Sequence, residues 1–328
     1  MIGFDRESFF LYLLEREAIT KGVGDDCCLI DFHSKKSSFH TTKKSPTPHF
    51  FYTKPHKAHI PAQNITSLVM GMDSFCEGVH FLQGWFSPYE LAQKAFLVNY
   101  SDIVAMNATP LYATLSIALP KSWHKAEIRA FVRGVGDFCR THHIALIGGD
   151  TIGATSLQIH ITLFAKPHKH TLYRDKIPPK SLLYYTSDTY PRYTITQSHK
   201  VLKTLLNTPK HKPLRAKGRF LAPRIRSRFI QECASFLKGG MDISDGILSD
   251  MIKLCGINKL GFKAYLPLFA PHLRHLLQSG ESYEMLLAIA PKDRLKLQRK
   301  AAMHRIKVCP LGAFTRKRYA LPPHKAWH

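Results

Sequence analysis

The chain has 328 residues, of which 47 are Lys or Arg and 23 are Asp or Glu, so its net charge at pH 7 is +24, and 45% of its residues are hydrophobic. This length favours two domains, and the hydrophobic content excludes a chain that is disordered throughout. The apolar runs stop far short of the roughly 20 residues that a membrane-spanning helix needs. The 7 cysteines form no CxxC pair and the N-terminus has no signal-like pattern, so we expect a cytoplasmic protein with free thiols.

The first half of the chain predicts strands that alternate with helices. Expected strands lie at residues 29–32, 67–72, 112–119, 144–147 and 157–163. The fourth of these is uniformly apolar and is expected to be buried. Ser87, Pro88 and Glu90 have the spacing of a capping box with Pro at the first helical position, which predicts the start of a helix. A second helix is expected at 128–139, and residues 33–66, rich in Lys, His, Ser and Pro, predict a flexible basic loop.

The second half resumes the same alternation after another basic stretch. Its expected elements are a strand at 182–185, a helix at 228–237, a turn at 242–246, a helix at 247–255 and strands near 285–290. The whole pattern predicts an α/β fold, with an N-terminal domain at 1–166 and a C-terminal domain at 167–328.

Acidic residues are few, yet many of them lie in short Gly-rich or apolar segments. These segments are residues 22–26, 71–73, 101–102, 148–150, 241–246 and 280–281. A carboxylate that follows a buried strand needs a partner, because burying an isolated charge is costly. Lys or Arg could be that partner in so basic a chain. Spaced carboxylates beside glycines are more typical of a hard-metal site, where their oxygens hold Mg²⁺ against a polyphosphate.

Several of these residues also have simpler explanations. Ser244 and Asp245 are well placed to cap the helix expected at 247–255. Lys94 could pair with Glu90 one helical turn away, or it could meet a phosphate. Asp102 falls on the apolar stripe of the helix that starts after Ser87, so its side chain is expected to point inward.

Six segments resemble, in the same order, motifs of the thiamine-monophosphate kinase family. Residues 22–26 (GVGDD) are similar to the family's GIGDDA, and residues 72–81 (MDSFCEGVHF) to its TTD-x-x-x-EGVHF. The others are residues 94–108, 146–151, 241–250 and 279–284. The chain departs from the family where Gly71 and Met72 replace threonines and where Ser282 replaces an acid beside the substrate position.

The resemblance implies a two-domain PurM-like fold, in which the N-terminal α/β domain pairs with that of a second subunit to form a β-barrel in a homodimer. It also implies a kinase that transfers the γ-phosphoryl group of ATP to thiamine monophosphate, assisted by several Mg²⁺ ions, in thiamine diphosphate biosynthesis. A phosphate acceptor is already ionised at neutral pH, so positioning and charge neutralisation would supply the catalysis without a catalytic side chain.

Matched residue by residue, the resemblance implies three sets of site residues. The Mg²⁺ ligands would be Asp26, Asp73, Asp102, Asp150, Asp242 and Asp245. The nucleotide would contact Gly149, Asp150, Arg174 and Ser244, and the thiamine monophosphate would contact His80, Glu281 and Trp327.

Two alternatives remain open from the sequence. The chain could be another ATP-dependent enzyme of the PurM superfamily, although a selenophosphate synthetase is expected to have a Cys before the first Gly-Asp-Asp segment, and no Cys precedes Cys27. It could instead be a non-catalytic basic protein that binds nucleotides or nucleic acid. Nucleic acid is not the expected partner, because Lys and Arg are spread along the whole chain and no nucleic-acid-binding motif accompanies them.

Overall fold

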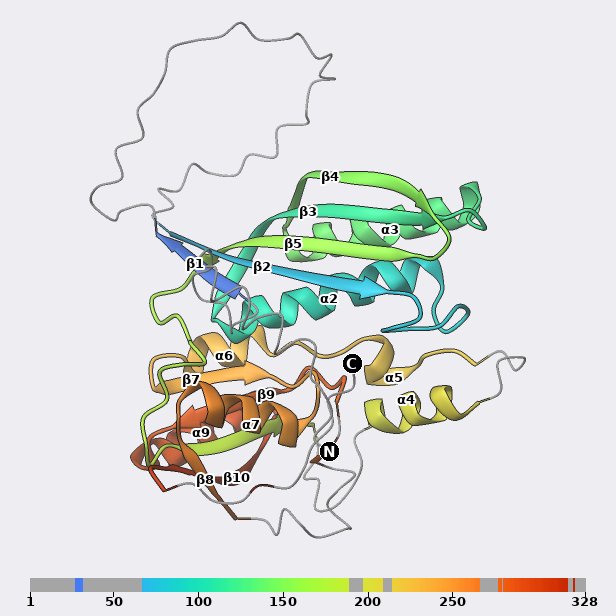
Figure 1. Cartoon of the computed structure of the whole chain (residues 1–328). Coiled ribbons are helices and arrows are strands. Elements are labelled where there is room, and N and C mark those ends of the chain that lie inside the picture. The colour runs from blue at the N-terminus through green and yellow to red at the C-terminus, as the bar shows by residue number, and fades with distance from the viewer. Residues whose placement is uncertain are drawn as a thin grey trace, which may run out of the picture.

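The structure is a computed structural model, and it describes residues 27–31, 67–188, 197–208, 214–265, 277–278, 280–317 and 321. The predictions for Asp26, Trp327 and the loop at 33–66 lie outside these residues. The described chain forms two sheets of five strands each, joined by helices (Figure 1). None of its described helices is long and apolar enough to cross a membrane.

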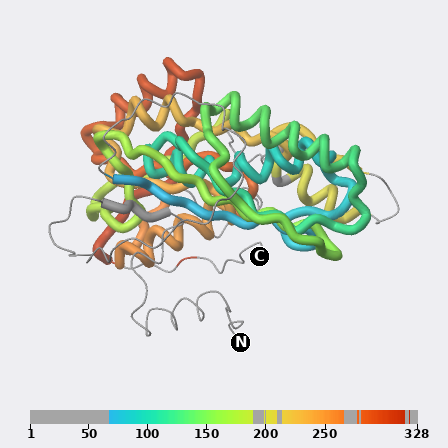
Figure 2. Tube along the Cα trace, turned by 90° about the horizontal axis from the view of Figure 1, so that it is seen from above, coloured from blue at the N-terminus to red at the C-terminus, as the bar shows by residue number. Residues whose placement is uncertain are grey.

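The first sheet has the strand order β1-β2-β5-β3-β4. Its strands are β1 (Cys27–Asp31), β2 (Ser67–Cys76), β3 (Ala108–Pro120), β4 (Ala145–Ala154) and β5 (Gln158–Pro167). Neighbouring strands are antiparallel, except β3 and β4, which are parallel. Helices α2 (Pro88–Ala105) and α3 (Lys125–His142) pack on one face of this sheet, as the view from above shows (Figure 2).

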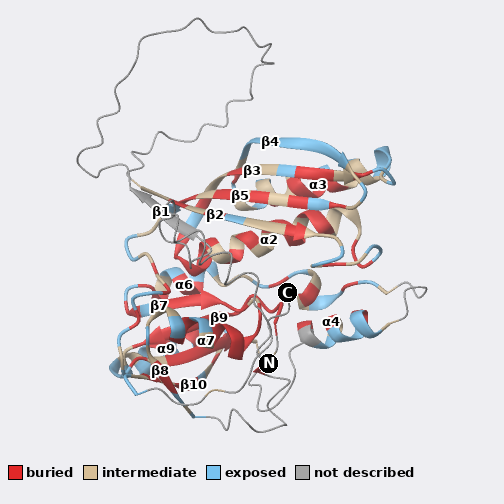
Figure 3. Cartoon of the chain, viewed as in Figure 1, coloured by how far each residue is buried: buried red, intermediate tan, exposed pale blue. Residues whose placement is uncertain are grey.

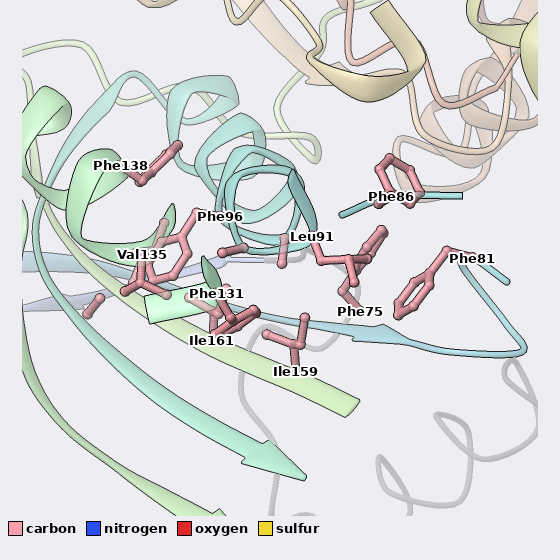
Figure 4. Close-up of a cluster of buried hydrophobic side chains, with 14 of the residues drawn as sticks. Phe75, Phe81, Phe86, Leu91, Phe96, Phe131, Val135, Phe138, Ile159 and Ile161 are labelled. Carbon is pink, nitrogen blue, oxygen red and sulfur yellow. The ribbon is translucent and has the colours of Figure 1, made fainter. Parts of the chain in front are cut away.

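The local signals for α2 act as the sequence predicts. The Ser87 hydroxyl accepts the N–H of Glu90 at 3.3 Å, and the Glu90 carboxylate accepts the N–H of Ser87 at 2.7 Å. This reciprocal capping satisfies N–H groups that the first turn of a helix leaves without partners. The helix then presents Phe96 to Phe138 of α3, with ring centroids 5.1 Å apart, above the buried face of β5 (Figure 4).

The second sheet is antiparallel and has the order β7-β9-β6-β10-β8. Its strands are β6 (Leu182–Ser187), β7 (Leu237–Asp242), β8 (Gly261–Ala264), β9 (Met285–Ile289) and β10 (Lys307–Thr315). The helices of this half are α4 (Gln197–Asn207), α5 (Gly218–Leu221), α6 (Ser227–Cys233), α7 (Ile247–Ile257) and α9 (Arg294–Met303), with a short 3₁₀ turn at Pro291–Asp293. Every residue of β9 is buried, as expected for a strand with neighbours on both sides and helices packed on it.

The prediction for two segments is wrong in detail. The helix expected at 228–237 ends at Cys233, and Leu237 already begins β7. The strand expected to be buried at 144–147 is part of an exposed edge strand, with Leu146 48% and Ile147 58% exposed (Figure 3). A short apolar run is compatible with a buried strand and with a sheet edge, and only the strand order distinguishes them.

Candidate active site

Acidic residues from both halves of the chain act electrostatically on the buried hydroxyl of Tyr283, a residue that is 4% exposed. Burial raises the pKa of the Tyr283 hydroxyl far above its usual value, and the nearby charges of Glu281, Asp73, Asp242 and Asp102 raise this pKa further. Four of the carboxylates that the sequence predicts to be site residues therefore lie within electrostatic reach of one phenol. They come from β2, α2, the end of β7 and the segment before β9.

Arg174 supplies the positive charge at this cluster. Its Nη2 lies 3.7 Å from Oδ1 of Asp102 and 4.0 Å from Oδ1 of Asp242, and its side chain is only 8% exposed. The Ser101 hydroxyl donates to Oδ2 of Asp242 at 2.7 Å. The end of α2 is thus joined to the end of β7, and Asp102 points inward as its place on the helix predicts.

The loop at 242–246 is held by an acid that follows it in the sequence. Oδ2 of Asp250 accepts the N–H groups of Ser244 at 3.1 Å and Gly246 at 3.2 Å. Residue Gly246, with a φ of 120°, is the N-cap of α7, and no side chain caps the helix. The capping role considered for Ser244 and Asp245 is therefore wrong, and Asp245 instead pairs with Nζ of Lys253 at 2.6 Å.

Asp250 makes the stability of the protein depend on pH. Burial raises the pKa of Asp250 from 3.8 to about 8, with the nearby charge of Lys253 opposing the shift and the neighbouring carboxylates Asp245 and Asp242 adding to it. Between these values the folded state keeps a proton that the unfolded state has lost, so the free energy of unfolding falls as pH rises toward 8.

We expect Asp250→Asn to remove this penalty, since an amide oxygen can still accept the two N–H groups. Measured by urea unfolding in EDTA, the stability of wild type should fall relative to that of the variant by up to about 1.4 kcal/mol per pH unit between pH 5 and pH 8, given roughly one proton per site. Parallel pH curves for the two proteins would show that Asp250 is already ionised in the folded state.

The segment before β9 has an unusual backbone. Glu281 and Tyr283 both have positive φ, at 55° and 49°. Such angles are unfavourable for residues with a side chain, and they persist only where the surroundings impose them. Here the N–H of Glu281 donates to the carbonyl of Ser244 at 2.8 Å, and the N–H of Tyr283 donates to the carbonyl of Ile243 at 3.0 Å. The loop at 242–246 thus fixes the residues that carry Glu281.

Two of the expected site regions lie farther from the cluster. His80 follows the end of β2, where its Nδ1 accepts the N–H of Cys76 at 3.0 Å. Gly149 and Asp150 lie on the exposed edge strand β4. Since β4 is separated from β2 by three inter-strand steps of about 4.8 Å, Asp150 is about 14 Å from the strand that carries Asp73.

The carboxylates of this site are the chemical type of ligand that a hard divalent cation takes, but they are not grouped as a metal site would group them. Within the residues that the structure describes, no three His, Cys, Asp or Glu side chains are grouped closely enough to hold a metal. Asp102 and Asp242 nevertheless both lie within 4.0 Å of the same guanidinium nitrogen of Arg174, so the fold places two carboxylates where they share a cation. Carboxylate oxygens are the ligands that Mg²⁺ prefers, and Asp73 adds another within reach of the same phenol.

The sequence alone did not identify Ser101 and Tyr283 as parts of this site, and for Lys94 it left two partners open, Glu90 and a phosphate. Glu90 pairs with Nη2 of Arg215 at 2.7 Å, and Nζ of Lys94 lies 3.1 Å from Oε2 of Glu281. Ser101 and Tyr283 lie within the quoted motif segments, next to acids. This position next to an acid in a motif is the sequence feature that could have identified both residues.

Comparisons of the sequence and the fold with those of known proteins identify relatives of this chain. Residues 54–166 match the family described as AIR synthase related protein, N-terminal domain. The thiamine-monophosphate kinase of Leptospira interrogans is 34% identical over 230 residues, which cover 65% of this chain and 72% of that protein. That of Bacillus subtilis is 25% identical over 262 residues, covering 74% and 79% of the two chains.

The fold is shared with a solved structure described as AaThiL complexed with AMPPCP and TMP. The TM-score is 0.71 at 19% sequence identity, and the match covers 100% of this chain and 99% of the other. This likeness confirms the expected PurM-like α/β fold. Because the Leptospira relative exceeds 30% identity over more than two thirds of its own length, the chain belongs to the thiamine-monophosphate kinase family.

Proposed function

We propose that this protein transfers the γ-phosphoryl group of ATP to thiamine monophosphate, forming thiamine diphosphate and ADP. Its similarity to curated thiamine-monophosphate kinases supports the reaction. The observation that carries the proposal is that Asp102 and Asp242, from two separate motifs, both lie within 4.0 Å of one guanidinium nitrogen of Arg174. We place the reaction in the cytoplasm, since none of the five described cysteines is in a disulfide.

The proposed division of labour follows the three sets of residues. Mg²⁺ would be held by Asp26, Asp73, Asp102, Asp150, Asp242 and Asp245, and when bound it supplies neutralisation of the phosphate charge. ATP would contact Gly149, Asp150, Arg174 and Ser244, and thiamine monophosphate would contact His80, Glu281 and Trp327. Arg174 already lies against two of the acids, so its guanidinium is placed to turn from them toward a phosphate.

The acceptor phosphate needs no general base because it is ionised at neutral pH. What the chain must provide is alignment of the acceptor with the γ-phosphoryl group and exclusion of water. The backbone of the segment before β9 is fixed by two hydrogen bonds to the loop at 242–246. Both segments therefore present their side chains in one arrangement, which suits a reaction that depends on positioning.

We also propose that the protein acts as a homodimer that pairs the open face of the first sheet. Ile159, Ile161 and Leu163 of β5 are buried under the helices, and the alternate residues of the strand face the other way. Met72 and Thr114 lie opposite Thr162 on that second face. Met72 is 61% exposed there, and Ile152 of β4 is 57% exposed. Pairing two such faces would cover apolar side chains that water now contacts.

Met72→Glu should disrupt this pairing, because it places a charge in the centre of the proposed interface. We expect the dissociation constant of the dimer to rise by about 100-fold or more. Sedimentation velocity over a concentration series measures this. Met303→Glu is the matched control, because Met303 is 71% exposed and lies on α9, which packs with the second sheet. A wild-type monomer at micromolar concentration, or an unaffected Met72→Glu dimer, would contradict the proposal.

The reaction itself is tested by incubating the protein with thiamine monophosphate, ATP and Mg²⁺ and separating the products. Thiamine diphosphate and ADP should form in equal amounts, and EDTA should stop their formation. ATP binding that depends on Mg²⁺, without any thiamine diphosphate, would overturn the proposed acceptor while leaving the nucleotide site in place.

A further inference from the structure

Lys94 is a buried cation at the junction of the two halves. It lies in the middle of α2, yet its side chain is 0% exposed. Its Nζ lies 3.1 Å from Oε2 of Glu281, a residue 187 positions away in the sequence. The same ammonium lies 4.5 Å from the ring centroid of Tyr283 and 5.1 Å from that of Phe220 in α5. Three segments that are distant in sequence thus meet on one side chain.

A cation in this position needs compensation. Removing an ammonium from water costs several kcal/mol, so a lysine without partners would not be buried here. The carboxylate of Glu281 and the faces of two aromatic rings provide the compensation. Burial lowers the pKa of Lys94, and the charge and hydrogen bond of Glu281 act in the opposite direction. The ammonium is enclosed by protein on all sides, so its role is to bind Glu281 and not to meet solvent.

The carboxylate of Glu281 is held at both oxygens. Oε2 accepts from Lys94, and Oε1 accepts from the hydroxyl of Tyr283 at 3.3 Å. Its backbone has a φ of 55° and is tied to the carbonyl of Ser244. A carboxylate with both oxygens engaged and a fixed backbone has one orientation, which is what a ligand contact requires.

We propose that Lys94 is a positioning residue for the acceptor substrate, because its ammonium fixes the carboxylate of Glu281 and joins the N-terminal half to the segment before β9. This inference rests on the proposed function in one respect: it takes Glu281 as a contact of thiamine monophosphate. It adds a role for a residue on the opposite half of the molecule. Loss of the ammonium should therefore weaken acceptor binding without touching the ATP site.

The test is a double-mutant cycle of Lys94→Met, Glu281→Gln and the combined variant, read out by calorimetry of thiamine monophosphate in the presence of a non-hydrolysable ATP analogue. We expect Lys94→Met to raise the dissociation constant of thiamine monophosphate about 10-fold to 100-fold, as is typical when a supporting partner of a binding residue is removed. The dissociation constant of the ATP analogue should stay within about twofold, since Lys94 contacts Glu281, Tyr283 and Phe220 and these are not among the proposed ATP contacts. The combined variant should bind thiamine monophosphate no worse than Glu281→Gln does.

Lys300→Met is the matched control. Lys300 also pairs with a glutamate, at 3.0 Å from Oε2 of Glu232, but it lies on α9 with a side chain that is 29% exposed. It should leave both dissociation constants unchanged. Lys94→Met leaves the buried carboxylate of Glu281 without its partner and could fail to fold. In that case the combined variant, which removes both charges of the pair, is compared with Glu281→Gln in its affinity for thiamine monophosphate. The positioning role would be overturned if the two substitutions had additive effects on the binding of thiamine monophosphate. It would also be overturned if Lys94→Met weakened the binding of thiamine monophosphate and of the ATP analogue equally.

The outcomes separate this inference from the proposed function. Wild type that binds thiamine monophosphate without converting it would refute the reaction and leave the Lys94 cycle interpretable. Wild type that does not bind thiamine monophosphate at all would overturn both.

Discussion

Asp242→Asn should reduce kcat for thiamine diphosphate formation by about 100-fold to 1,000-fold, the range seen when a group that stabilises transferring charge is removed. Asp242 is 2% exposed, accepts the hydroxyl of Ser101 at 2.7 Å and lies 4.0 Å from the Arg174 guanidinium. An asparagine has the same shape and can still accept from Ser101. The substitution therefore removes one negative charge from the cluster and little of its packing.

The measurement is kcat as a function of Mg²⁺ concentration. The variant should need more Mg²⁺ for half-maximal activity, because a ligand with a full charge has been replaced by a neutral one. Asp137→Asn is the control: Asp137 is an exposed acid on α3 that pairs with Arg140, and its loss should leave kcat unchanged. Normal activity of Asp242→Asn at limiting Mg²⁺ would remove Asp242 from the metal site.

Glu284→Gln should lower the free energy of unfolding by about 3 to 5 kcal/mol, the usual cost of breaking a buried charge network by removing one partner. The Glu284 side chain is 5% exposed and pairs with Arg219 and Arg226, whose Nη2 lies 2.7 Å from Oε1. It also accepts the hydroxyl of Thr186 at 2.5 Å. Without the carboxylate, Asp188 would be the acid that the two guanidinium groups share within the described part of the chain, so their burial would be poorly compensated.

Glu232→Gln is the matched control for this effect, and urea unfolding of the two variants is the measurement. Glu232 also contacts several cations, namely Arg228, Lys300 and His304, and these contacts, with that of Lys300 the largest, lower the pKa of Glu232 to about 2. Because it lies at the surface, solvent can replace these contacts, and its substitution should change stability little. Equal losses for the two variants would show that burial does not decide the strength of the network.

Much of the secondary structure could be predicted from the sequence. The start of α2 follows from the capping box at Ser87 and Glu90, and the alternation at 157–163 predicts β5 with its buried face. These signals depend on residues within one turn or one strand, which is why they are visible in a single sequence. The error at 144–147 has the opposite cause, since exposure of β4 depends on its place at the edge of the sheet.

The candidate site was predictable where a motif marks it and not where distant residues complete it. Asp73, Asp102, Asp242 and Glu281 come from four of the quoted segments, and in the structure the charges of all four act on the hydroxyl of Tyr283. Asp150 lies on the exposed β4 strand, so its proposed contact with metal and nucleotide stays a prediction.

The sequence by itself determined the order of the elements and the family, and it predicts which acids a phosphoryl-transfer site would use. The tertiary structure alone decided how the charges are partnered. Lys94 binds Glu281 across 187 positions instead of Glu90 one turn away, and Ser101 donates to Asp242 across 141 positions. The reason is physical: local signals act through the backbone of a few residues, whereas the partner of a buried charge is whichever group the packed chain leaves within reach.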